Sequence, residues 1–318
     1  MRSIREFAVK NRTVAKTIRI GTRDSQLALW QARTVEQKLN NLGYRTELIA
    51  IKSAGDLILD KPLYEFGITG IFTKTLDAAM ISGQVDIAVH SMKDVPTALP
   101  KGIVQCAVLE RENPKDILAY TKAPDFTSEL TIATGSLRRQ AQWLNRYPHH
   151  NIVDLRGNVN TRLQKLRDNN WGGAVFASAG LDRLGIKPEK HIDLDWMIPA
   201  PAQGAMVVVA MHADVFCCEA VSKLNHVETD VCTFAERQFL KELEGGCTAP
   251  IGALATIFGD EVRFEGVLCS IDGQEKIHIE KTTTISHARN DFGKQCAQEA
   301  LANGGAEVMA KIKRDLNK

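Results

Sequence analysis

The 318-residue sequence lacks a long apolar run. No stretch approaches the roughly 18 apolar residues that a membrane-spanning helix needs. The N-terminal segment MRSIREFAVKNRTVAK is basic and has no apolar core of the kind found in secretory signals. We therefore expect a cytoplasmic protein without a membrane span.

A strong excess of charge of one sign is also missing, because the formal net charge is only +2. Dedicated nucleic-acid binders are usually far more basic, so any positive field must be local. The seven cysteines are an odd number, and their spacing matches neither a disulfide framework nor a zinc site. We interpret most of them as small buried apolar side chains and expect no bound metal.

What the sequence does contain is an alternation of strand-like and helix-like segments. The strand pattern TIRIG is followed by helical periodicity from Leu27 to Leu42, which ends at Gly43. Strand patterns at ELIAI and VDIAV follow, separated by the amphipathic segment IFTKTLDAAMISG. After Pro114 the alternation resumes with TIATGS, NIVDL and GAVFAS, each followed by a helical pattern. This order is typical of parallel sheets covered by helices on both faces.

The remaining segments define the domain organisation. The apolar run MVVVAMH, which follows IPAPAQGA, has the composition of a buried strand, and we expect it to return to the first lobe. From about Thr229 the pattern changes to one helix, three strand-like runs and two further helical segments. We predict an α/β fold with three domains: a first lobe at residues 17–112 plus 205–224, a second lobe at 113–204, and a small α+β C-terminal domain at 225–318.

Basic side chains follow the predicted parallel strands. In an open α/β sheet, ligands bind beyond the carboxyl ends of the strands, where helix N-termini present free N–H groups to anions. Arginine offers a planar fork of donors to carboxylates and phosphates. The polar residues at these strand ends are Arg23, Ser25, Lys93, Asp94, Ser136, Arg138, Arg139, Arg156 and Arg183. Any single arginine could be a solvated surface charge, but their repetition predicts one cleft for a polyanionic ligand.

Asp94 is a lone acid within this basic set. Nearby positive charge favours its ionised form, which suits it to stabilise cationic intermediates and to exchange protons with nitrogen. The alternative is a structural ion pair with its neighbour Lys93.

Five motifs in this order resemble the hydroxymethylbilane synthase family, also called porphobilinogen deaminase: GTRDSQLALWQA, VDIAVHSMKDVPTALP, TGSLRRQAQ, LRGNVNTRLQKL and LEGGCTAPIG. The likeness runs from about Thr17 to the C-terminus. It implies a transferase of tetrapyrrole (heme) biosynthesis that joins four porphobilinogen molecules head to tail, with loss of ammonia, into linear hydroxymethylbilane. The implied fold has two lobes resembling type II periplasmic binding proteins and a small third domain.

The resemblance also implies roles for individual residues. Cys247, on the glycine turn of EGGCTAP, would carry a dipyrromethane cofactor through a thioether, because a bulky electrophile can approach a thiol on an open turn. Asp94 would be the catalytic residue that stabilises positive charge as ammonia leaves. Further cofactor contacts are expected from Ser91, Lys93, Ser136, Arg138 and Arg139. Substrate contacts are expected from Arg23, Ser25, Phe72, Arg156, Arg162 and Arg183.

One loop departs from the family pattern. Many members carry lysines where this chain has Glu65 and Thr69 in the stretch YEFGITGIF. Thr69 supplies no positive charge, so we expect a weaker grip on one carboxylate there. Phe72 is expected to pack beside the cofactor, and an ordinary core aromatic is the alternative reading.

Two other functions stay open at this point. A bilobal binding protein for a small anion would use the same lobes without catalysis, since a fold does not settle a function. It would need neither Cys247 nor a third domain. An RNA-binding module would use the arginine clusters and show steep salt dependence. For the enzyme, the expected partners are porphobilinogen and the growing oligopyrrole, with no nucleic acid, no membrane and a monomeric state.

Overall fold

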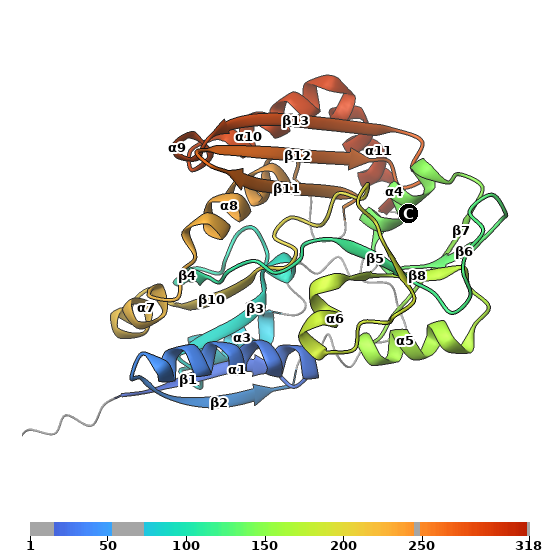
Figure 1. The fold of residues 1–318 in the computed structure, drawn as a ribbon. Coiled ribbons are helices and arrows are strands. Elements are labelled where there is room, and N and C mark those ends of the chain that lie inside the picture. Colours follow the sequence, from blue (N-terminus) through green and yellow to red (C-terminus); the bar gives the residue numbers. More distant parts are fainter. Residues whose placement is uncertain (1–15, 53–72, 245–248, 317–318) are drawn as a thin grey trace, which may run out of the picture.

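The structure, a computed structural model, describes residues 16–52, 73–244 and 249–316. The predictions for Glu65, Thr69, Phe72 and Cys247 lie outside these residues. Within the described ranges the strands form three separate sheets, two of five strands and one of three. The three-stranded sheet and its helices lie above the other two sheets in the view of Figure 1. No helix in the described part of the chain is both long enough and apolar enough to cross a bilayer.

The first lobe is built on a sheet with the strand order β2-β1-β3-β10-β4. Strands β1 (Thr17–Arg23), β2 (Arg45–Ile51) and β3 (Ile87–Ser91) are parallel. Strand β10 (Met206–Met211) runs antiparallel between β3 and β4 (Ile103–Val108). The three strands that the alternation predicted as parallel are parallel, and β10 makes the sheet mixed. The apolar composition of β10 suits this central position, where both of its faces are covered.

Helices cover both faces of this sheet. Helix α1 (Gln26–Asn41) and α7 (Val215–Ser222) share a buried cluster with alternate residues of β1, such as Ile20. Helix α3 (Lys74–Ile81) packs on the opposite face, against residues such as Ala88 of β3. This two-sided burial explains why β3 reads as a continuous apolar run.

The second lobe repeats the arrangement with the order β7-β6-β8-β5-β9. Strands β6 (Thr131–Ala133), β7 (Asn151–Val153) and β8 (Gly173–Ala177) are parallel. Strand β5 (Asp116–Ala119) runs antiparallel between β8 and β9 (His191–Asp193). Each sheet thus contains one antiparallel strand that comes after the chain has crossed from the other lobe. In the second lobe this strand is β5, and in the first lobe it is β10.

Helices α4 (Leu137–Arg146), α5 (Val159–Asp168) and α6 (Ser178–Leu184) follow β6, β7 and β8. Because the three strands are parallel, the helices begin at the same edge of the sheet. Arg138 and Arg139 consequently lie in the first turn of α4.

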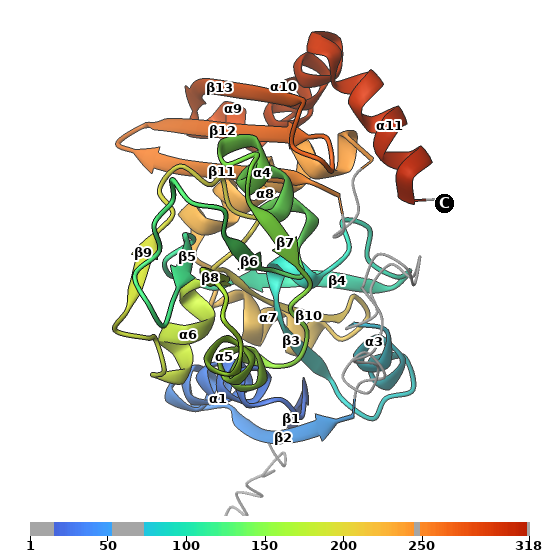
Figure 2. The same cartoon turned by 90° about the vertical axis from the view of Figure 1, so that its right-hand side faces the viewer.

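The C-terminal domain is an antiparallel sheet with helices packed on one face (Figures 1 and 2). Its strands are β11 (Ile251–Phe258), β12 (Glu261–Cys269) and β13 (Lys276–Thr284). Its helical segments are α8 (Val227–Glu242), α9 (Ile285–Ala288), α10 (Phe292–Ala300), the π-helical turn η3 (Leu301–Gly305) and α11 (Ala306–Leu316). This mixed composition confirms the predicted fold class of α/β lobes with a small α+β domain.

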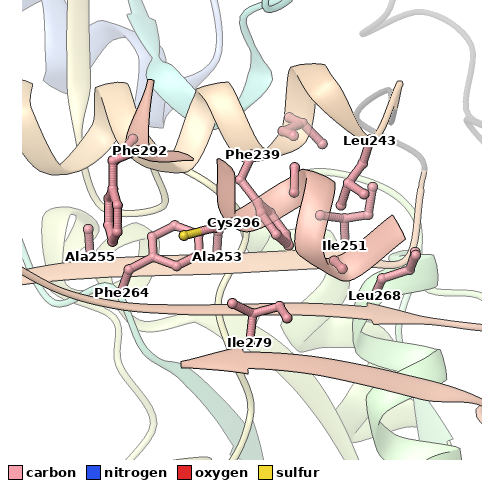
Figure 3. Close-up of a cluster of buried hydrophobic side chains, with 14 of the residues drawn as sticks. Phe239, Leu243, Ile251, Ala253, Ala255, Phe264, Leu268, Ile279, Phe292 and Cys296 are labelled. Carbon is pink, nitrogen blue, oxygen red and sulfur yellow. The ribbon is translucent and has the colours of Figure 1, made fainter. Parts of the chain in front are cut away.

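The core of the C-terminal domain is organised around three phenylalanines (Figure 3). The ring centroid of Phe264 on β12 lies 5.3 Å from that of Phe239 on α8 and 6.0 Å from that of Phe292 on α10, both edge-on. Edge-to-face pairs of this kind add stability beyond the area that they bury. The sulfur of Cys296 is buried in the same core, so this cysteine acts as an apolar side chain.

Two crossovers connect the lobes and run side by side: the outward crossover (residues 109–115) and the return crossover (residues 198–205). The backbone N–H of Leu109 donates to Met206 at 3.0 Å, and that of Glu112 donates to Gly204 at 3.3 Å. Gly204 has a φ of +88°, and a Cβ there would lie 2.6 Å from the backbone oxygen of Glu112. Only glycine therefore allows the crossovers to approach this closely.

Glu236 of α8 fixes the C-terminal domain to both crossovers. Its fully buried carboxylate accepts hydrogen bonds from Nη1 and Nη2 of Arg111 at 2.6 and 3.0 Å. The backbone N–H groups of Ala202 and Ala255 also donate to it, each at 2.7 Å. One side chain thus satisfies donors from the outward crossover, the return crossover and β11, which holds the three parts of the molecule together.

We expect Glu236→Leu to lower the free energy of unfolding by roughly 3–5 kcal/mol, because it leaves the buried Arg111 guanidinium without a counter-ion. Urea unfolding monitored by circular dichroism measures the change. Glu228→Leu, on the exposed face of the same helix, is the control and should cost less than about 1 kcal/mol. A loss no larger for Glu236→Leu than for the control would contradict this role.

Candidate functional site

Side chains from both lobes share one electrostatic neighbourhood at the strand ends. Lys93 of the first lobe interacts electrostatically with Asp94 and with Arg138 and Arg139 of the second. Arg162 of α5 in turn interacts with Arg139 and with Asp94. Of the predicted site residues, these lie near one another in space, and they come from segments far apart in the sequence.

The segment that carries Lys93 and Asp94 is the short 3-10 helix η2 (Met92–Asp94), which directly follows β3. Arg237 of α8 holds this segment by donating to the backbone oxygens of Met92, Val95 and Pro96 at 3.3, 2.9 and 2.6 Å. The C-terminal domain therefore fixes the turn on which the predicted catalytic residue lies.

Lys93 is a partly exposed lysine with an altered pKa. Burial, which is the largest cause, and repulsion by Arg139 and Arg138 together lower the pKa of its ammonium group to about 8, against the opposite effect of Asp94 and Asp116. The Nζ atom lies 3.4 Å from Oε1 of Gln203. Lys93 is thus charged below about pH 8 and loses its charge as the pH rises through that value.

The arginines of α4 share a buried carboxylate, Asp116, at the start of β5. Oδ1 of Asp116 lies 2.8 Å from Nη2 of Arg139, and Oδ2 lies 2.8 Å from Nη1 of Arg138. Arg139 also donates to the backbone oxygen of Val175 at 3.0 Å, and Arg138 to that of Ile198 at 2.8 Å. All three charged side chains are more than nine-tenths buried. Burial alone would raise the pKa of the Asp116 carboxyl, but the two guanidinium groups hold it well below its usual range.

Among the described residues, the positive charges of this cluster outnumber the negative ones. Asp116 and Asp94 supply two negative charges against the three positive charges of Arg138, Arg139 and Lys93. The Nε atom of Arg138 has no hydrogen-bond partner among the described residues. A carboxylate ligand would complete both the charge and the missing hydrogen bond.

Arg162 and Arg156 extend the positive charge toward α5. Burial and repulsion by Arg139 and Arg156 lower the pKa of Arg162 to about 10, and its Nε donates to the backbone oxygen of Gly157 at 2.8 Å. Arg156 is also buried, with Nε 3.8 Å from Oδ2 of Asp154. Arg162 keeps its charge at neutral pH.

Arg183 has a different environment from the other arginines. Its Nε donates to Oε2 of Glu112 at 2.8 Å, and its Nη2 donates to the backbone oxygen of Gly204 at 2.7 Å. These partners belong to the outward and return crossovers, so Arg183 braces the connection between the lobes. With Lys93 and Ser91 it also lines a cavity of about 40 Å³ between the lobes.

The first-lobe residues make contacts of their own. The hydroxyl of Ser25 accepts from the backbone N–H of Ala28 at 3.3 Å and so caps α1. The hydroxyl of Ser91 accepts from Nε2 of Gln31 at 2.7 Å. Burial lowers the pKa of His90 to about 4, and repulsion by Arg23 adds to this effect. The Ser136 hydroxyl, in contrast, makes no capping bond to α4.

The described cysteines are free thiols, and those in the core are poor nucleophiles. Burial raises the pKa of Cys217, Cys232 and Cys296 to about 12, so they stay protonated at neutral pH. Within residues 16–52, 73–244 and 249–316, no group of three or more metal-ligating side chains occurs.

Two family models match the chain. The first, "Porphobilinogen deaminase, dipyromethane cofactor binding domain", matches residues 18–219, and the second, "Porphobilinogen deaminase, C-terminal domain", matches residues 231–302. The chain belongs to the porphobilinogen deaminase family. This confirms the family resemblance drawn from the five motifs.

Curated members of the porphobilinogen deaminase family align with the chain along almost its whole length. The porphobilinogen deaminase of Pelobacter propionicus is 38% identical over 304 residues, which cover 93% of this chain and 97% of that protein. The porphobilinogen deaminase of Pelotomaculum thermopropionicum is 40% identical over 309 residues, which cover 94% and 98%.

Solved structures with partial similarity include the periplasmic VFT2 domain of Bordetella pertussis BvgS and the probable amino-acid-binding protein ytmK of Bacillus subtilis. The first has 13% identity and a TM-score of 0.41, and covers 65% of this chain and 86% of that one. The second has 11% identity and a TM-score of 0.42, and covers 66% and 90%.

Two buried polar residues of this cluster, Asp116 and Gln203, were not predicted from the sequence. Asp116 stands at the start of the short apolar segment DILA, and an acid beside a buried strand is a signal that it is paired with a cation. Gln203 carries no comparable signal, because an amide side chain in a loop is common.

We expect Asp116→Asn to lower the free energy of unfolding by roughly 3–5 kcal/mol at pH 7, because two buried guanidinium groups lose their counter-ion. The folded-state pKa of Asp116 lies below its ordinary value of 3.8. Its contribution is therefore complete above that value and is lost as the pH falls through the folded-state pKa.

Denaturant unfolding at a series of pH values between 8 and 3 tests this expectation. The difference between wild type and Asp116→Asn should stay constant from pH 8 to about 5 and shrink only in strong acid. Asp193→Asn, an exposed change on β9, is the matched control and should alter stability by less than about 0.5 kcal/mol. A difference that disappears already near neutral pH would contradict the buried ion pairs.

Proposed function

We propose that this protein is a hydroxymethylbilane synthase, a transferase that condenses four porphobilinogen molecules head to tail with loss of ammonia. Its product, linear hydroxymethylbilane, is a precursor in tetrapyrrole biosynthesis. Membership of the porphobilinogen deaminase family supports this function. The structural observation that supports it is the electrostatic interaction of the acid Asp94 with Arg162, which belongs to a buried group of cations in the other lobe.

A polycarboxylate substrate fits this charge. Each pyrrole of porphobilinogen carries an acetate and a propionate, so a chain grown to six rings would present about twelve carboxylates to the protein's cations. We assign the binding of these carboxylates to Arg23, Ser25, Arg156, Arg162 and Arg183, with Phe72 packed beside the rings. Arg183 has two nitrogens bonded to the crossovers, so it also links ligand binding to the junction of the lobes.

The donor set also fits the dipyrromethane cofactor that the family implies. Arg138 has an unpartnered buried Nε, and the Ser136 hydroxyl is not used to cap α4. We assign the cofactor's carboxylates to these two residues together with Arg139, Lys93 and Ser91, and its thioether to Cys247. When bound, the cofactor supplies the pyrrole carbon from which the chain grows.

Asp94 acts as the catalytic residue in this proposal. Its carboxylate accepts hydrogen bonds from pyrrole N–H groups and stabilises the positive charge that develops on porphobilinogen as the carbon–nitrogen bond breaks and ammonia leaves. It then accepts the proton that the pyrrole carbon gives up when the new carbon–carbon bond has formed. The turn η2, held by Arg237, keeps the carboxylate in place for each round.

We propose the domain bounds 17–112 plus 205–224, 113–204 and 225–318, which the three separate sheets support.

We also propose a monomeric, cytoplasmic protein that acts on porphobilinogen without nucleic acid or membrane. Free thiols at the described cysteines support a reducing compartment. Light scattering after gel filtration measures the oligomeric state.

We expect the intact mass of the denatured protein to exceed the mass of the chain by two pyrrole units. The excess should be absent in Cys247→Ser, because a hydroxyl cannot form the thioether. Cys232→Ser, on the described helix α8, is the control and should keep the excess. An unmodified wild-type chain would favour a small-anion binding protein, and binding of polynucleotide with steep salt dependence would favour the RNA-binding alternative.

We expect Asp94→Asn to fold normally and to lose about 10²–10⁴ in kcat, because the amide cannot neutralise the developing cation or take up the proton. Production of hydroxymethylbilane under saturating porphobilinogen measures the loss, and circular dichroism checks the fold. Asp193→Asn serves again as the control and should keep wild-type turnover. Turnover of Asp94→Asn within about threefold of wild type would refute the catalytic role.

A further inference from the structure

Gln203 lies between Lys93 and Asp116, two groups of opposite charge. It belongs to the return crossover, and only 1% of its surface is exposed. Sequence analysis assigned it no function, and the proposed reaction does not use it.

The orientation of the Gln203 amide is fixed by its partners. Its Nε2 donates to the backbone oxygen of Pro114 at 2.7 Å and to Oδ1 of Asp116 at 2.9 Å. Both acceptors require the NH₂ group on that side, so the amide oxygen must point the other way. Oε1 accordingly lies 3.4 Å from Nζ of Lys93.

The backbone of Gln203 is held as firmly as its side chain. Its carbonyl oxygen accepts from Nε of Arg111 at 2.8 Å, and its N–H donates to the backbone oxygen of Ala200 at 2.9 Å. Arg111 is in turn fixed by Glu236 of the C-terminal domain. The position of this one amide therefore depends on both crossovers and on the C-terminal domain.

We propose that Gln203 is a positioning residue for Lys93, whose amide keeps the ammonium group directed toward Asp94 and separated from Asp116. The inference rests on the proposed function, because it assumes that the charge of Lys93 serves a ligand in the cleft.

The distribution of charge around Asp116 explains why a neutral side chain stands here. Asp116 is already shared by Arg138 and Arg139. A direct ion pair between Lys93 and Asp116 would draw the ammonium group out of the cleft and weaken the hold of Asp116 on the arginines. A neutral amide between them offers each group a hydrogen bond of the correct sense and allows no such pair.

Besides the neutral amide of Gln203, several charged groups act on Lys93. Asp94 and Asp116 favour its charged form, and Arg138 and Arg139 oppose it. Arg183 of α6 lines the same small cavity between the lobes. Replacement of the amide therefore changes the balance of these charges at Lys93, and the change can be measured as a pKa.

The test compares Gln203→Met and Gln203→Glu with wild-type holoenzyme. Competitive labelling with acetic anhydride across pH 6 to 11, followed by peptide mass spectrometry, gives the pKa of Lys93 without any turnover. In Gln203→Met, Lys93 is expected to turn toward Asp116, and in Gln203→Glu it gains a carboxylate. In both variants its pKa should rise from about 8 toward its ordinary value of 10.5.

Turnover gives a second readout. Both variants should lose about 10- to 100-fold in kcat with little change in KM, because Lys93 turns away from Asp94 while the substrate-binding arginines keep their places. Gln142→Met is the matched control. Gln142 is 3% exposed, and its amide makes two hydrogen bonds to the backbone of Ile198, away from Lys93. It should lower the melting temperature by a similar amount and leave the pKa of Lys93 unchanged.

The possible failures are distinguishable. If the Gln203 variants fold, keep the pKa of Lys93 near 8 and behave like Gln142→Met, the positioning role is wrong although the enzyme is active. If the wild-type protein makes no hydroxymethylbilane and carries no pyrrole adduct, the proposed function fails instead. The labelling experiment still reports in that case, because it requires neither substrate nor product.

Discussion

The site depends on the ion pairs that the buried carboxylate of Asp116 forms with two arginines. Two guanidinium groups could not be buried beside each other without a counter-ion, because removing a charge from water costs several kcal/mol. Asp116 makes their burial tolerable by pairing with both at 2.8 Å. These ion pairs fix the arginines in place. Because Asp116 neutralises only one of the two charges, the site stays positive. A rigid positive site of this kind is pre-organised for a polycarboxylate, whose binding then requires little rearrangement.

The position of this charge follows from the topology of the lobes. Asp116 begins β5, directly after the outward crossover, and Gln203 lies on the return crossover beside it. Glu236 and Arg237, one residue apart on α8, fix the crossovers and the turn that carries Asp94. The cations of the second lobe, the acid of the first and the C-terminal domain are therefore connected through the two crossovers. A movement of one lobe would change the geometry of the site, because these few hydrogen bonds connect the two.

Local patterns in the sequence predicted much of the fold but not its connections. Helix α1 was recognisable because its apolar residues repeat with the helical period, and β3 because it contains a short apolar run. Strands β5 and β9 are only four and three residues long, too short for a period to be read. The role of Gln203 could not be predicted, since it depends on Lys93, 110 residues earlier in the chain. The same holds for Asp116, whose importance appears only when its two arginine partners are placed around it.

For the arginines near the strand ends, residue type and position in the sequence predict a charged cleft. They do not predict what each arginine does. Arg183 lies in the last turn of α6, where it is bonded to Glu112 and Gly204, whereas Arg156 lies between β7 and α5, near Asp154. Which acceptors each guanidinium group reaches is determined by the tertiary structure. Where acceptors are sufficient, the arginine braces the fold. Where cations outnumber them, as around Asp116, the remaining charge is available to a ligand, and a chain with a net charge of only +2 can still hold a polyanion.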